Sequence, residues 1–92
     1  MAKATLKIQY CGGWGYKRYA LALQKKLRDE FTTDDLEITF LQDFGTTGNF
    51  EVFIENNNSL IHSKSTKGQG RCENQTEVSA VIEHVKEYLE SL

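Results

Sequence analysis

The chain has 92 residues, a formal net charge of -2 and 39% hydrophobic residues. This length provides for one hydrophobic core, so we expect a single domain over residues 1–92. The weakly acidic balance argues against a nucleic-acid-binding protein, and no apolar run reaches the roughly 18 residues of a membrane span. Residues 1–3 lead directly into a strand pattern and leave no room for a signal peptide. We therefore expect a cytoplasmic monomer without membrane or nucleic-acid partners.

Hydrophobic periodicity in the first half of the chain predicts a strand, a helix and a second strand. Residues 5–10 alternate between apolar and polar, which is typical of a half-buried strand. In residues 17–31 apolar side chains recur every four positions and basic residues occupy the other faces, which predicts an amphipathic helix. Residues 36–40 alternate again. A strand, a helix and a strand in this order predict a parallel strand pair with a right-handed crossover.

The second half predicts a hairpin and a final helix. Residues 50–55 and 60–62 flank three consecutive asparagines, which favour a turn. Asn74, with Glu77 three residues later, resembles a helix cap, and apolar residues then follow at helical spacing up to Leu92. The expected fold is α/β, an α+β sandwich of order β-α-β-β-β-α. In this thioredoxin-like arrangement, a mixed four-stranded sheet carries two helices.

A glycine-rich turn over residues 11–16 separates the first strand from the first helix. It begins with Cys11, one of two cysteines in the chain. The start of a helix presents unpaired N–H groups and positive dipole, which favour a thiolate over a thiol. A cysteine in a tight turn can equally be a small buried hydrophobic residue. Position alone leaves both interpretations open. Two cysteines make neither a disulfide framework nor a good zinc site.

Several short motifs resemble one known family. They are Tyr10-Cys11-Gly12-Gly13, Gly15-Tyr16-Lys17, Gly48-Asn49-Phe50-Glu51-Val52, Leu60-Ile61-His62-Ser63-Lys64 and Gly68-Gln69-Gly70. Over the chain from Leu6 onward, the sequence resembles selenoprotein W and its relatives, the small Rdx proteins with a thioredoxin-like fold. The resemblance implies a Cys-x-x-Sec or Cys-x-x-Cys pair in the turn, formed by Cys11 and position 14.

Trp14 departs from this family pattern, because it stands where a selenol or thiol is expected. Selenocysteine is encoded by UGA, one base away from the tryptophan codon UGG. One hypothesis is that the natural protein has selenocysteine at position 14 and that this chain carries a substitute or a misreading. The alternative is a natural Cys-x-x-Trp member that has lost its second redox centre. We favour the substitution because the flanking residues match the family.

The resemblance implies a thiol or selenol redox protein that acts through the Cys11-x-x-Trp14 turn. Its expected chemistry is glutathione-linked antioxidant activity or protein-disulfide exchange, without a bound cofactor. Glutathione or thiol proteins are then its partners, and glutathione is a substrate or a mixed-disulfide partner. Whether the chain is an enzyme stays open, and we expect the Trp14 form to be impaired. The alternative is a redox-regulated interaction module that controls a partner protein without turnover.

Three other features bear on the turn. Cys72 is the only other thiol, so a bridge to Cys11 is conceivable, although we favour a thiol with no redox role. Lys17 and Arg18 could lower the pKa of Cys11 or form solvated surface. The chain has no proline, so residues 47–49 must shape the wall that a cis-proline forms in thioredoxins.

Overall fold

The computed structural model describes residues 2–13 and 15–92. The elements are β1 (Ala4–Tyr10), α1 (Lys17–Glu30), β2 (Leu36–Gln42), β3 (Phe50–Ile54), the 3₁₀ turn η1 (Glu55–Asn57), β4 (Ser59–Ser63) and α2 (Gln75–Glu90). This order confirms the β-α-β-β-β-α prediction. The boundaries differ slightly, since β2 continues to Gln42 and α1 ends one residue before Phe31.

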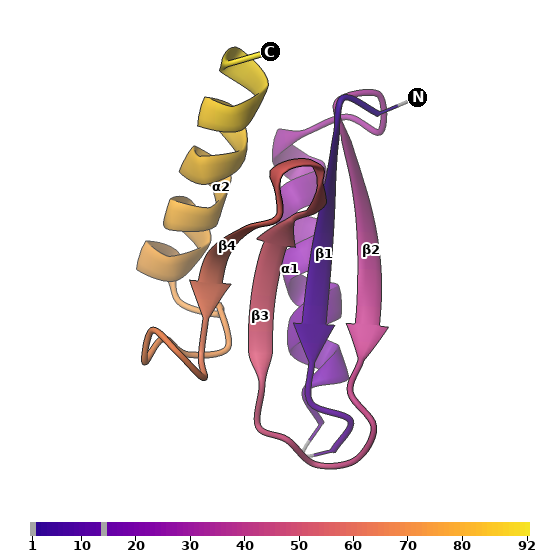
Figure 1. Ribbon diagram of the computed structural model, residues 1–92, viewed down its shortest axis with the longest axis vertical. Coiled ribbons are helices and arrows are strands. Elements are labelled where there is room, and N and C mark those ends of the chain that lie inside the picture. Colours follow the sequence, from indigo (N-terminus) through magenta and orange to yellow (C-terminus); the bar gives the residue numbers. More distant parts are fainter. Residues whose placement is uncertain (1, 14) are drawn as a thin grey trace.

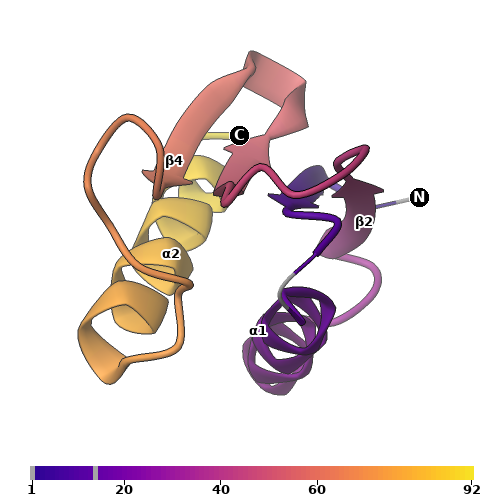
Figure 2. The same ribbon diagram turned by 90° about the horizontal axis from the view of Figure 1, so that it is seen from below.

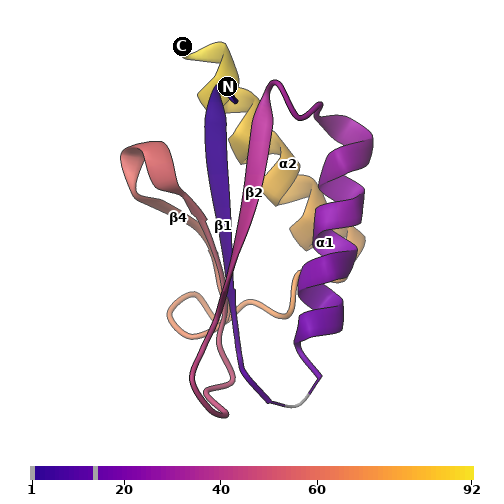
Figure 3. The same cartoon turned by 90° about the vertical axis from the view of Figure 1, so that its right-hand side faces the viewer.

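The four strands form one mixed sheet in the order β2-β1-β3-β4. β1 and β2 are parallel, whereas β3 is antiparallel to both β1 and β4. Both helices cover the same face of this sheet, which leaves a two-layer α+β structure (Figures 2 and 3). Tyr10 pairs with Gln42, so β1 and β2 end together. The turn after β1 and the loop after β2 therefore lie at the same end of the strands, which is the lower end in Figure 1.

The core lies between the helices and the sheet. The buried residues of α1 and α2 lie on the apolar stripes predicted from the sequence: Ala20, Leu23 and Leu27 on α1, and Val78, Val81 and Val85 on α2. β1 buries every second residue, as its alternation predicts. β2 departs from its pattern at Phe40, which is 37% exposed. β2 is an edge strand, and its last residues are covered less completely than those of the central strands.

The hairpin turn and the cap of α2 form as their sequences predict. Asn58 has a φ of 53°, in the left-handed region that asparagine tolerates. The Asn74 side chain accepts a hydrogen bond of 2.8 Å from the Glu77 N–H, which satisfies one of the unpaired donors at the start of α2. In the part of the chain that the structure describes, neither helix has the length and apolarity that crossing a membrane requires.

Two leucines on α1 test the assignment of its buried face. Leu23 is 1% exposed and Leu21 is 46% exposed. We expect Leu23→Ala to lower the free energy of unfolding by about 2–5 kcal/mol, because it leaves a cavity against the sheet. Leu21→Ala, the matched control, should change it by less than about 1 kcal/mol. Urea unfolding of both variants checks this, and equal losses would contradict the burial pattern.

Candidate functional site

Cys11 follows β1 directly and is buried beneath the loop that follows β2. Its side chain is 1% exposed. The Cys11 N–H donates to the Asn49 carbonyl over 2.9 Å, which extends the sheet pairing by one residue. Its sulfur accepts hydrogen bonds from the N–H groups of Gly13 and Thr47, both at 3.3 Å. The sulfur therefore lies between two backbone donors from different parts of the chain.

This environment lowers the pKa of the Cys11 thiol from its ordinary value. Burial alone raises the pKa, but hydrogen bonding from the N–H groups of Gly48, Gly13 and Thr47 outweighs it. The Thr47 hydroxyl also lowers the pKa. However, its single proton is directed to Asp43 Oδ2, at 2.5 Å, so we attribute the shift to the backbone donors. N–H donors lower the pKa because they hydrogen-bond the thiolate more strongly than the neutral thiol.

The hydrogen-bond donors to the Cys11 sulfur are not the ones that the sequence predicted. The sequence suggested the unpaired N–H groups of the first helix, but α1 begins only at Lys17. The donors to the sulfur come instead from the turn at Gly13 and from the loop at Thr47. The basic residues 17 and 18 are not among the causes of the pKa shift. Arg18 instead lies over the Tyr19 ring, 5.0 Å from its centroid.

Residues 47–49 form the wall beside Cys11 that the sequence led us to expect. Thr47 contacts the sulfur, and Asn49 contacts the Cys11 backbone. This loop also binds the turn itself, because the Gly12 N–H donates to the Gly45 carbonyl over 2.9 Å. The turn and the loop are thus held together by backbone hydrogen bonds on both sides of Cys11.

Trp14, the other residue that we assigned to the site, lies outside the described residues. Tyr16, the last residue of the turn, is buried, and its ring packs edge-to-face on Tyr19 at 6.1 Å. Arg71, from the loop before α2, lies over the Tyr19 ring at 4.5 Å. These contacts attach the start of α1 to the loop that carries Cys72.

Cys72 is a free thiol, as is Cys11, and its surroundings suppress its reactivity. It is 2% exposed, with a φ of 55°. Burial, together with the negative charge of Glu77, raises its pKa to about 12, against a smaller opposing effect of Lys26. A thiol with this pKa is almost entirely protonated near neutrality and is a poor nucleophile. This agrees with the favoured interpretation of Cys72 as a thiol without a redox role.

Two carboxylates near the site were not singled out from the sequence. Asp43, in the loop beside Cys11, accepts hydrogen bonds from the side chains of Gln9 on β1 and of Thr47 and Asn49 in the same loop. Glu51, buried on β3, accepts from the hydroxyls of Ser63 and Ser65 and from the Lys64 N–H. Burial raises the pKa of both carboxyls, but the hydrogen bonds outweigh it and lower them. The only signal for Asp43 in the sequence is an acidic residue in a short loop that also contains two threonines, Thr46 and Thr47.

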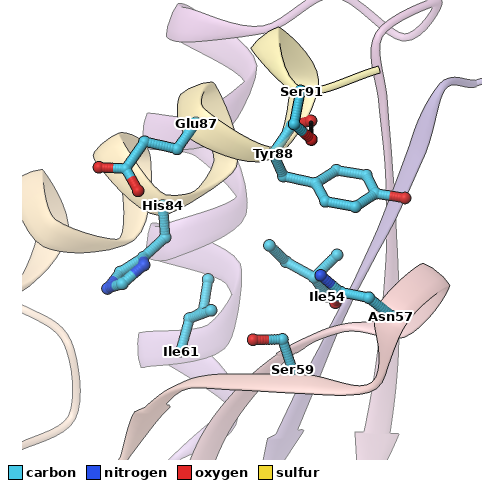
Figure 4. A pocket seen from close by; sticks show the side chains of 8 residues that line it. All are labelled: Ile54, Asn57, Ser59, Ile61, His84, Glu87, Tyr88 and Ser91. Atoms are coloured by element: carbon cyan, nitrogen blue, oxygen red, sulfur yellow. Dashed lines mark hydrogen bonds between the residues drawn. The ribbon is translucent and has the colours of Figure 1, made fainter.

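A separate groove of about 270 Å³ lies between α2 and the β3–β4 hairpin (Figure 4). Its lining residues are Ile54, Asn57, Ser59, Ile61, His84, Glu87, Tyr88 and Ser91. Ile54 pairs with Leu6, near the start of β1, so the groove lies toward the opposite end of the sheet from Cys11. Within residues 2–13 and 15–92, no cluster of three or more His, Cys, Asp or Glu side chains is placed to hold a metal ion.

Comparison with known proteins identifies the family. The Rdx family model matches residues 5–84. The chain belongs to the Rdx family. It is 37% identical to selenoprotein W of Macaca mulatta over 82 residues, which cover 89% of this chain and 90% of the relative. It is 35% identical to selenoprotein W of Danio rerio over 85 residues, covering 90% of this chain and 94% of the relative. Membership of the Rdx family points to a redox-related role.

A solved structure shares the fold of this Rdx protein. The crystal structure of a selenoprotein W-related protein from Vibrio cholerae superposes with a TM-score of 0.74. The superposition covers 95% of this chain and 98% of that one, at 22% sequence identity. The family resemblance and the α+β fold expected from the sequence are therefore both confirmed.

Gly12 tests the packing of the turn against the loop. A Cβ at this position would overlap the Asp43 carbonyl oxygen and lie 2.7 Å from the Gly45 carbonyl oxygen. We expect Gly12→Ala to lower the free energy of unfolding by about 1–3 kcal/mol, because both obstacles are backbone atoms. Gly15→Asn is the control, since nothing lies within 4 Å of a Cβ there and asparagine tolerates its φ of 69°. Urea unfolding should give a smaller loss for the control.

Cys72 should make the protein less stable at alkaline pH. The unfolded chain releases the Cys72 proton near the ordinary pKa of 9.0, whereas the folded protein retains it up to about 12. Between these two pH values, the free energy of unfolding falls by about 1.4 kcal/mol for each pH unit. Urea unfolding from about pH 8 to about pH 11 should therefore show a steeper loss of stability for the unsubstituted chain than for Cys72→Ala. Parallel profiles would contradict the raised pKa.

Proposed function

We propose that this Rdx protein is a thiol redox protein of the selenoprotein W type, acting on glutathione or on protein disulfides through residues 11–14. The observation that carries the proposal is the pair of N–H donors, from Gly13 and Thr47, on the sulfur of Cys11. These donors stabilise a thiolate, the form that attacks disulfides. The proposal includes a reducing, cytoplasmic setting, in which both cysteines remain free thiols.

The burial of Cys11 supports a specific division of work within the turn. A sulfur that is 1% exposed cannot meet a bulky disulfide unless the turn opens. A second attack, on a sulfur or selenium atom that the turn itself carries, needs no bulky molecule to reach the buried sulfur. We therefore assign the attack on the substrate to a selenol or thiol at position 14, and the second, resolving attack to Cys11. This chain has Trp14 at that position, so its cycle is incomplete.

The completed cycle transfers two electrons. The thiolate at position 14 attacks one sulfur of glutathione disulfide, whose S–S bond breaks and releases one glutathione thiolate. The Cys11 thiolate then attacks the sulfur at position 14 and displaces the second glutathione thiolate. Glutathione disulfide is reduced to two glutathione molecules, and the pair in the turn is oxidised to a disulfide. A dithiol reductant restores the pair.

Selenocysteine at position 14 of the natural protein is the related genetic proposal. It rests on the family and on the selenoprotein W relatives, whose name states the selenium. Sequencing the natural transcript tests it. We expect UGA at codon 14 and a selenocysteine insertion signal. A UGG codon without such a signal would contradict the proposal.

An exposed aromatic residue favours a second candidate, a redox-regulated interaction module that captures a partner without turnover. Phe44 lies in the loop beside Cys11, and its side chain is fully exposed. Its neighbours Asp43 and Gly45 contact the strand end and the turn through backbone hydrogen bonds. A protein bound at Phe44 would therefore lie close to the redox turn.

The Trp14→Cys variant tests the redox proposal. With an introduced thiol at position 14 and a resolving thiol at Cys11, we expect repeated turnover of glutathione disulfide with a dithiol reductant. The unsubstituted chain with Trp14 should show at least about a hundredfold less activity, corresponding to the loss of about 2.7 kcal/mol of transition-state stabilisation. Consumption of the reductant measures the rate.

Two matched variants complete this experiment. Trp14→Cys combined with Cys11→Ser should retain a single glutathione as a mixed disulfide, which mass spectrometry detects, because the resolving sulfur is missing. Trp14→Cys combined with Cys72→Ala should keep full turnover. Absence of turnover in Trp14→Cys, together with stable one-to-one capture of a protein that requires Phe44, would favour the interaction module instead.

A further inference from the structure

Asp43 is the point where the loop beside Cys11 is fixed to the sheet. Its N–H donates to the Tyr10 carbonyl over 2.8 Å, at the joint end of β1 and β2. One carboxylate oxygen accepts from the Gln9 side-chain amide at 2.7 Å. The other accepts from the Thr47 hydroxyl at 2.5 Å and from the Asn49 side-chain amide at 3.0 Å. A half-buried carboxylate thus joins β1 to both ends of the segment 47–49.

These contacts continue directly to the sulfur of Cys11. Thr47 donates its hydroxyl proton to Asp43 and its N–H to Cys11 Sγ. The Asn49 N–H donates back to the Thr47 hydroxyl oxygen at 3.3 Å, while the Asn49 carbonyl accepts from the Cys11 N–H. Two of the residues that Asp43 binds, Thr47 and Asn49, therefore also bind Cys11 from the loop.

Backbone hydrogen bonds hold this loop at Asp43, Gly45 and Asn49, and the Asp43 carboxylate adds contacts to the side chains of Thr47 and Asn49. Gly45 and Gly48 both have positive φ, and glycines at these positions leave many conformations open to the free loop. Hydrogen bonds to a charged acceptor are stronger than those between neutral groups. Without the carboxylate, the Thr47 N–H would still be present, but its direction toward the sulfur would no longer be fixed.

We propose that Asp43 is a positioning residue, which acts through Thr47 to hold a backbone N–H donor on the sulfur of Cys11. It touches neither the sulfur nor a substrate in this role. The role deepens the proposed redox function and rests on it for its biological meaning. The negative charge of Asp43 by itself would raise the pKa of Cys11, because a nearby negative charge disfavours a thiolate. Positioning of the Thr47 N–H lowers this pKa. The sign of the change on removing Asp43 therefore separates positioning from simple electrostatics.

The test is a difference titration of the Cys11 thiol. Thiolate absorbance near 240 nm is followed against pH for each variant and for the same variant with Cys11→Ser. The difference belongs to Cys11 alone. We expect Asp43→Ala to raise the pKa of Cys11 toward its ordinary value, because the Thr47 donor is released while the donors from Gly48 and Gly13 remain. Asp35→Ala removes the same charge from an aspartate that pairs with Lys3 at 3.4 Å, near the start of β2, and should leave the Cys11 pKa unchanged.

Thr47→Val provides a second variant that keeps the N–H donor and removes the hydroxyl bound to Asp43. We expect it also to raise the Cys11 pKa, and the double variant to raise the pKa no further than Asp43→Ala alone, since both changes break the hydrogen bond between Asp43 and Thr47. An unchanged or lowered pKa in Asp43→Ala overturns the proposal. If that variant does not fold, an unchanged pKa in Thr47→Val overturns it. The titration needs no disulfide substrate, so failure of the glutathione reaction with these shifts intact would overturn only the proposed function.

Discussion

The parallel pairing of β1 and β2 is the constraint on which the candidate site depends. Their register brings Tyr10 opposite Gln42, so the two strands end at the same level. The turn that begins at Cys11 and the loop that begins at Asp43 then leave the sheet side by side. A backbone donor far along the sequence can reach the sulfur only because of this pairing, since Thr47 lies 36 residues after Cys11.

The fold could be predicted because its signals are local and repeat many times. β1 alternates along its whole length, and the stripe on α2 continues from Val78 to Val85, so a single misleading residue does not change the assignment. The departure at Phe40 arises from the position of β2 at the edge of the sheet. Edge position depends on strand order, which periodicity within one strand does not contain.

The position of Cys11 at the end of β1 could be predicted from the sequence, but the hydrogen bonds to its sulfur could not. Cys11 at the end of a strand indicated a reactive sulfur, and the lowered pKa agrees with that. The donors, however, come from Gly13 and Thr47 rather than from α1. Asp43 escaped notice because a carboxylate in a polar loop resembles ordinary surface until the loop conformation is known. Hydrogen bonds between distant segments leave no periodic trace in a sequence.

The bond between Thr47 and Cys11 also makes the position of the loop depend on how well the sulfur accepts a hydrogen bond. A thiolate attracts the Thr47 N–H strongly, whereas a sulfur engaged in a disulfide offers it a far weaker acceptor. Without this hydrogen bond, residues 43–49 would be held by their remaining backbone contacts at Asp43, Gly45 and Asn49. The exposed ring of Phe44 is carried by this same segment, so a buried sulfur and an aromatic ring on the outer surface share one short loop.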